Sequence, residues 1–116
     1  MRLQSQETRW SNPVSNLFAD IPQDLPEELF ESLAQGNGVH IERIVSRGHS
    51  SPLEGWHEQA QAEWVMVVRG RASIAYTEKP SITLEAGDYV NIAAGEKHKV
   101  EWTSTDEDTI WLAVHY

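Results

Sequence analysis

The sequence predicts a mainly β protein with a short helical segment near its N-terminus. From residue 39 onward, segments rich in β-branched and aromatic residues recur at intervals of about ten residues, and glycine or proline separates most of them. Several short strands divided by turn signals are typical of an antiparallel sandwich or barrel. The expected strands are 39–46, 62–68, 72–77, 81–84, 89–92, 98–102 and 109–116.

The stretch before these strands predicts a helix over residues 25–35. Asp24 is a suitable N-cap, Glu27 three residues later completes a capping-box pattern, and Pro26 stands in the first turn. Apolar side chains at helical spacing would form one face, and Gly36 is a natural stop signal.

The chain length of 116 residues fits one domain and is too short for two ordinary ones. We expect residues 1–15 to form a loose arm and residues 16–116 to form a single β-barrel domain, with a helical lead-in over 16–36. The chain has no cysteine, so neither a disulfide nor a thiolate ligand is available.

The acidic composition argues against nucleic-acid and membrane partners. The chain carries 9 basic and 18 acidic residues, which gives a formal net charge of −9. Phosphate backbones and anionic membranes bind proteins largely through Lys and Arg, and these residues are scattered here. The N-terminus lacks the apolar stretch of a signal peptide, and no apolar run approaches the length of a membrane span. We therefore expect a cytoplasmic protein.

The segment that begins at His98 shows which of its faces is buried. Side chains alternate along a strand, so His98, Val100 and Trp102 share one face. Lys99 and Glu101 share the other face, and their charges place it in water. His98 is therefore expected to point into the barrel.

Two imidazoles and a carboxylate are expected to converge on the interior. His57 and Gln59 point the same way on an extended chain, and Glu63 opens the next predicted strand. Together with His98, these groups suit Fe(II), Mn(II), Ni(II) or Zn(II). Gln59 is a weak donor, which either binds the ion directly, holds a metal-bound water or hydrogen-bonds the backbone.

These residues resemble the first motif of the cupin superfamily, G-x5-H-x-H-x3–4-E-x6-G. The chain has His57-x-Gln59-x3-Glu63-x6-Gly70 in that order. It departs from the motif at two positions, since Ser51 stands where the first glycine belongs and Gln59 replaces the second histidine.

The second cupin motif, G-x5-P-x-G-x2-H-x3-N, is matched by Gly87-x5-Ala93-x-Gly95-x2-His98-x3-Trp102. Alanine replaces the proline and tryptophan replaces the asparagine. The resemblance implies a double-stranded β-helix, or jelly-roll barrel, with one divalent transition metal held at the ligand positions. Several further segments are similar to a subgroup of small single-domain cupins of mostly unassigned function. The metal-ligand positions that the resemblance gives are His57, Gln59, Glu63 and His98.

Aromatic and histidine side chains on the last strands are candidates for a pocket wall. His115 shares a face with Trp111, and we expect it to be a pocket or buried structural residue rather than a ligand. Trp102 and Trp111 either fill the core or wall a pocket.

The remaining polar candidates lie on and near the first predicted strand. Arg43 has the parity of the apolar residues two positions away, so it either enters the barrel to bind an anionic group or forms a salt bridge at the strand edge. His40 and His49 have no spacing argument and are expected at the surface.

Two functions from different classes are compatible with this pattern. One is a metal-dependent oxygenase or isomerase that acts on a small polar molecule, as the resemblance implies. The other is a non-catalytic cupin that binds or senses a small ligand, with a structural metal or none. A homodimer is expected in either case, because short strands leave sheet edges and a partly apolar face to cover.

Overall fold

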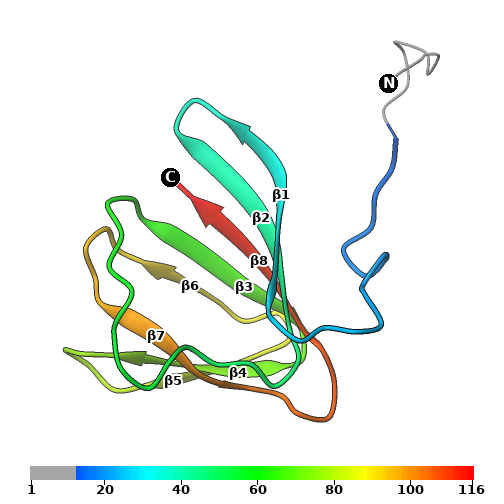
Figure 1. The fold of residues 1–116 in the computed structure, drawn as a ribbon. Coiled ribbons are helices and arrows are strands. Elements are labelled where there is room, and N and C mark those ends of the chain that lie inside the picture. The colour runs from blue at the N-terminus through cyan, green and yellow to red at the C-terminus, as the bar shows by residue number, and fades with distance from the viewer. Residues whose placement is uncertain (1–12) are drawn as a thin grey trace.

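The computed structural model describes residues 13–116, and the chain folds into two antiparallel sheets (Figure 1). The first sheet has five strands in the order β1-β2-β8-β3-β6, and the second has three in the order β5-β4-β7. The strands are β1 Leu29–Gly36, β2 Val39–Ser46, β3 Glu63–Arg69, β4 Arg71–Tyr76, β5 Ile82–Glu85, β6 Tyr89–Ile92, β7 His98–Thr103 and β8 Thr109–His115. The prediction of a mainly β protein is confirmed, and each expected strand has a counterpart.

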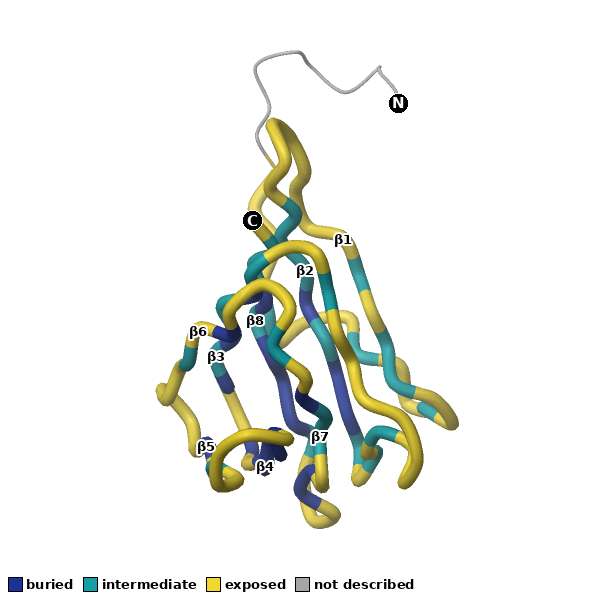
Figure 2. Tube along the Cα trace, turned by 90° about the vertical axis from the view of Figure 1, so that its left-hand side faces the viewer, coloured by how far each residue is buried: buried dark blue, intermediate teal, exposed yellow. Residues whose placement is uncertain are grey.

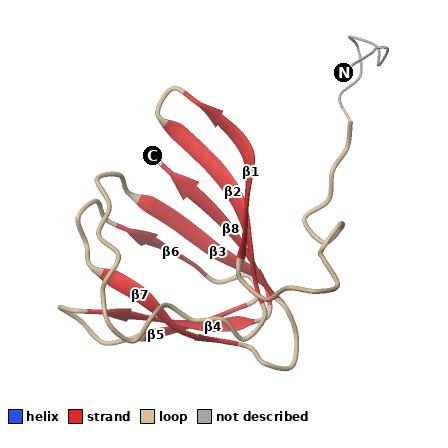
Figure 3. Ribbon diagram, in the orientation of Figure 1, coloured by secondary structure: helices blue, strands red, loops and turns tan. Residues whose placement is uncertain are grey.

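The helix predicted over residues 25–35 is wrong. Figure 3 shows only strands and loops in the described part of the chain, and β1 occupies most of the predicted helix. This strand pairs with β2 through a tight turn in which Asn37 and Gly38 have φ values of 48° and 78°. Asn-Gly is the preferred pair for a two-residue turn with positive φ at both positions. The hairpin therefore overrides the local helix signals, and the helical lead-in over 16–36 is absent.

The hydrophobic core lies between the two sheets. Val65 and Val67 of β3, Ile74 of β4 and Trp111 of β8 belong to one cluster of buried residues. Figure 2 shows the buried residues concentrated in the strands, whereas most of β1 and the loops are exposed. Figure 1 shows the sheets close together at one end and farther apart at the other. The starts of β3 and β7 and the end of β8 lie at the wider end.

The segment before β1 packs on the outer face of the larger sheet. Arg43 of β2 is 4% exposed and donates hydrogen bonds to the carbonyl oxygens of Leu17 and Ala19, at 2.9 and 2.6 Å. It also forms a salt bridge with Glu31 of β1. This network satisfies a buried guanidinium, as a buried charge requires.

Most of the loose arm expected over residues 1–15 lies outside the described residues. None of the described residues forms a helix that is long and apolar enough to span a membrane. Edge strand β1 exposes Phe30 and Leu33. The homodimer stays a prediction.

Candidate metal centre

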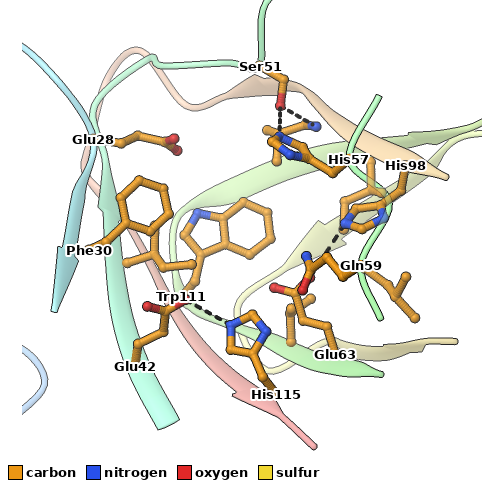
Figure 4. Close-up of a pocket in the computed structure, with 15 residues that line it drawn as sticks. Glu28, Phe30, Glu42, Ser51, His57, Gln59, Glu63, His98, Trp111 and His115 are labelled. Carbon is orange, nitrogen blue, oxygen red and sulfur yellow. Dashed lines mark hydrogen bonds and ion pairs between the residues drawn. The ribbon is translucent and has the colours of Figure 1, made fainter. Parts of the chain in front are cut away.

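A cavity of about 220 Å³ opens between the sheets at their wider end. All four residues expected to hold a metal line this cavity, as do Trp111 and His115 (Figure 4). Its apolar wall includes Val65, Ile74 and Ile92. Polar groups therefore gather beside an apolar wall, which is the usual composition of a small-molecule site. The four expected metal-holding residues are His57, Gln59, Glu63 and His98.

His98 is buried and its ring orientation is fixed. Its Nδ1 donates to the carbonyl oxygen of Glu96 at 3.0 Å, which directs Nε2 toward Glu63. The distance from Nε2 to a carboxylate oxygen of Glu63 is 3.4 Å. A backbone carbonyl on the outer ring nitrogen is a common way to orient a metal-ligating histidine.

Glu63 is the buried carboxylate of the cavity. Burial alone would raise its pKa, but the hydrogen bond from His98 and the nearby charges of His115 and His98 outweigh burial, so the pKa is lowered. Burial likewise acts to lower the pKa of His98, and its bonds to Glu63 and the Glu96 carbonyl reverse the sign, so that pKa is raised. The two shifts agree in describing a mutually stabilising pair.

Gln59 links the two motif segments. Its side-chain Nε2 donates to Glu63 at 3.1 Å, and its backbone oxygen accepts from the N–H of Gly95 at 2.8 Å. The amide oxygen is thus the atom of Gln59 left for coordination. Because one residue contacts both motifs, the carboxylate and the loop before His98 are positioned together.

His57 lies at the exposed rim of the cavity. Its backbone pairs with that of His98 through two hydrogen bonds of 2.8 and 3.1 Å, and the two ring centroids are 5.9 Å apart. Ser51 stands 3.4 Å from Nε2 of His57 and accepts a hydrogen bond from the N–H of Val100. The serine in place of the first motif glycine therefore helps to hold the rim histidine.

A second polar cluster adjoins these residues on β2 and β8. His115 Nε2 lies 2.8 Å from a carboxylate oxygen of Glu42, and the rings of His115 and His40 are stacked with centroids 5.8 Å apart. The ligand atoms of all three residues lie within 4.8 Å of one another, close enough to hold one metal ion. His40 was expected at the surface, but it is half-buried in this cluster.

The parity of β2 explains why the sequence did not reveal this cluster. Both faces of β2 are covered, so apolar residues occur at odd and even positions and do not mark the inward face. Glu42 and Ile44 line the cavity, whereas Arg43 between them faces the opposite way, toward the segment before β1, residues 17–20, which is called the outer segment below. The cluster becomes visible only when β2 is known to pair with β8, because this pairing puts His40 directly opposite His115.

Residues 41–115 match the family described as the Cupin_2 cupin domain. The chain is a cupin. A protein from Ralstonia eutropha, provisionally described as a mannose-6-phosphate isomerase, is similar at 42% identity and a TM-score of 0.86, covering 90% of this chain and 97% of that one. A comparison with curated proteins found no match.

Two more distant solved cupins show the fold alone. One from Desulfitobacterium hafniense has 20% identity and a TM-score of 0.67, covering 82% of each chain. One from Methanocaldococcus jannaschii, described as a double-stranded β-helix, has 16% identity and a TM-score of 0.64, covering 83% of this chain and 85% of that one. The double-stranded β-helix expected from the motifs is confirmed.

Two of the candidate pocket side chains, Arg43 and Trp102, lie elsewhere in this cupin, and Arg43 forms a salt bridge with Glu31 of the edge strand, which was its alternative. Arg43 faces the outer segment, as described above. Trp102 is 39% exposed, and the guanidinium of Arg71 lies 5.9 Å from its ring centroid. A bulge causes this, because Trp102 pairs with Ser73 whereas Val100 pairs with Ile74, the next residue of β4. The extra residue reverses the alternation and turns Trp102 outward.

Proposed function

We propose that this cupin holds one divalent transition metal through His57, Glu63 and His98 and acts on a small polar molecule in the cavity. Gln59 holds Glu63 in place and offers its amide oxygen as a fourth donor. The observation that carries the proposal is the buried Glu63–His98 pair, in which Nε2 of the imidazole faces the carboxylate at 3.4 Å. Imidazole and carboxylate are donor types that suit Fe, Mn, Ni and Zn. Among the described residues, His40, Glu42 and His115 are the group whose ligand atoms all lie within 4.8 Å of one another, so His57 would have to turn inward from the rim to join Glu63 and His98.

A metal in this position would polarise a carbonyl or bind oxygen, which corresponds to isomerase- or oxygenase-type chemistry. The protein's own contribution would be to bind and orient the substrate. The apolar wall that includes Trp111 excludes water, and His98 and Glu63 are held by the contacts already described. His115 lies on the same cavity wall and offers a further imidazole to a bound molecule.

The side chains of the cavity, apart from any bound ion, favour a neutral or cationic substrate. Among the residues that the structure describes, Glu28, Glu42 and Glu63 line the cavity, and neither Lys nor Arg does so. A phosphate group would approach three carboxylates without a fixed cationic side chain to bind it. The name of the Ralstonia eutropha protein refers to a phosphorylated sugar. For this chain, we propose an unphosphorylated polar molecule instead.

A non-catalytic ligand-binding cupin is the second candidate function. The observation in its favour is that Glu63 already has two partners in the protein, His98 and the amide of Gln59. A buried carboxylate satisfied in this way does not need a metal ion to fold. In that case the cavity would bind or sense a small ligand without turnover.

Metal content in matched variants tests the site. Purified protein should retain a transition metal, and chelation should lower its melting temperature, because an ion bound only to the folded state stabilises it. His98→Ala and Glu63→Gln should each weaken retention at this site at least about tenfold, since losing even an outer partner of a metal ligand has about that effect. His49→Ala is the control, because its imidazole bonds Arg47 and Pro26 outside the cavity. Retention unchanged in both His98→Ala and Glu63→Gln would refute the site.

Paired ligands test the substrate class. Metal-loaded protein would be screened with neutral sugars, enols and keto compounds and with the phosphate ester of each, following product formation, oxygen uptake and thermal shift. We expect turnover or stabilisation by unphosphorylated members, and a consistent preference for the esters would refute the charge argument. Stabilisation without turnover would favour the binding function.

A further inference from the structure

We infer that His40, Glu42 and His115 form a second divalent-cation site in this cupin, beside the one proposed above. The three residues come from two adjacent strands of the larger sheet. His40 and His115 are direct cross-strand partners, and Glu42 follows two residues after His40 on the same face. The directly opposite pair His40 and His115 has Cβ atoms about 5 Å apart, and a diagonal neighbour such as Glu42 is still within reach of a long side chain.

The distances between ligand atoms fit a bound cation. The atoms offered by the three residues lie within 4.8 Å of one another, and His115 Nε2 is 2.8 Å from Glu42 Oε1. Two imidazoles and one carboxylate can bind Zn(II), Mn(II), Fe(II) or Co(II), with water at the remaining positions. The side chains of His115 and Glu42 are 14% and 15% exposed, so an ion has access from solvent.

Neighbouring groups hold the two rings as they would around an ion. Ser32 of β1 places Oγ 3.0 Å from Nε2 of His40. Glu63 of β3 is the cross-strand partner of His115 on the side away from β2. Figure 4 shows the His115 ring with one nitrogen toward Glu42 and the other side of the ring toward Glu63.

The charges of the cavity favour a cation here over a simple ion pair. Glu28, Glu42 and Glu63 line one cavity, so the two charges of one divalent ion at the motif residues would leave one of the three carboxylate charges unbalanced. A divalent ion held by the two imidazoles and Glu42 would offset the negative charge that remains.

Titration of metal-free protein with Zn(II) and Co(II) tests this site separately from the motif site. Calorimetry on the wild type should give two ions per chain, and the cobalt absorption spectrum should change in two steps. His40→Ala and Glu42→Gln should each remove one ion, leaving the other dissociation constant within about threefold. His98→Ala should remove the other ion, and His40→Ala combined with His98→Ala should bind none. Glu28→Gln is the control, because Glu28 lines the same cavity but bonds Ser46 outside the cluster.

Each outcome assigns the two sites independently. One ion lost in His98→Ala but retained in His40→Ala and Glu42→Gln would overturn the second site and leave the proposed function standing. One ion lost in His40→Ala but retained in His98→Ala would uphold the second site and remove the motif site. The far-UV circular dichroism of each variant should match the wild type. If His40→Ala does not fold, His40→Gln and Glu42→Gln give the same decision.

Discussion

Gly70→Ala should destabilise the protein more than any ordinary surface substitution, because both the backbone conformation and the close packing at this position require glycine. Gly70 has φ +87°, a conformation that L residues rarely adopt. A Cβ placed there would also lie 2.5 Å from Thr109 Oγ1, 2.8 Å from Thr109 Cα and 2.9 Å from the backbone oxygen of Asp108. Two of these three atoms are backbone, so a change of side-chain rotamer cannot relieve the contact.

The magnitude can be worked out from the two effects. An L residue in the left-handed region costs about 1–2 kcal/mol. Forcing an extra carbon into a packed site costs about 1–3 kcal/mol more. The lower entropy of the unfolded alanine variant offsets about 0.4–1 kcal/mol. The free energy of unfolding should therefore fall by about 1–4.6 kcal/mol. The segment has little room to shift, since the Arg71 carbonyl also accepts from Thr109 Oγ1 and from the N–H of Ser104.

Gly87→Ala provides a matched control. Gly87 has a similar φ of +94°, but a Cβ there meets nothing within 4 Å. This variant should show the conformational cost alone, at most about 2 kcal/mol. Urea unfolding followed by tryptophan fluorescence, with the slope of the transition compared between variants, measures both changes. If the losses of unfolding free energy in Gly70→Ala and Gly87→Ala differed by less than about 0.5 kcal/mol, the close contact between Gly70 and β8 would not explain the need for glycine. That result would refute the reasoning.

Two further predictions concern polar contacts away from the cavity. Arg43→Leu should lower the free energy of unfolding by about 2–3 kcal/mol, because it removes charged hydrogen bonds to carbonyl groups of the outer segment. Hydrogen exchange should show lost protection near Arg43, and unchanged exchange there would contradict the anchoring role. The hydrogen bond from Arg47 outweighs burial and holds the pKa of Asp108 below its usual range, so this pair stabilises the protein above pH about 4 and loses that effect as pH falls through the folded pKa. Asp108→Asn should lower the free energy of unfolding by at most about 1 kcal/mol at pH 7, because the pair is partly exposed. The loss should become smaller as the pH falls, and an equal loss at pH 7 and pH 3 would contradict this.

The strands could be predicted from the sequence because their turns carry strong local signals. The exception is the region before residue 39, where a capping-box pattern and a strong turn signal compete. Gly36 was interpreted as the end of a helix, whereas Asn37 and Gly38 form the turn of a hairpin. A hairpin with β2 lets β1 complete the edge of the larger sheet, and a lone helix of that length is marginal without packing. Long-range pairing therefore decided the outcome.

In the candidate site too, local patterns placed some residues correctly, and long-range features of the fold decided the others. The parity of β7 correctly placed His98 inside, but it failed at Trp102 because a bulge cannot be seen from alternation alone. On β2 neither face is solvated, since one lines the cavity and the other is covered by the segment that Arg43 binds. Alternation of polar and apolar residues identifies an inward face only when the opposite face is in water.

Gln59 shows why the second cluster matters for the chemistry of the cavity. The motif has an imidazole at this position, and the amide that replaces it donates its NH₂ group to Glu63 instead of offering a nitrogen lone pair. The motif residues alone thus retain two imidazoles, His57 and His98. His115 supplies a third from the neighbouring strand, directly opposite Glu63 in the pairing of β3 with β8. The buried carboxylate therefore has histidines from two different sheets as neighbours, His98 at 3.4 Å and His115 across the pairing of β3 with β8. Although glutamine replaces one motif histidine, the cavity still has imidazole donors, because β2 and β8 supply His40 and His115 beside it.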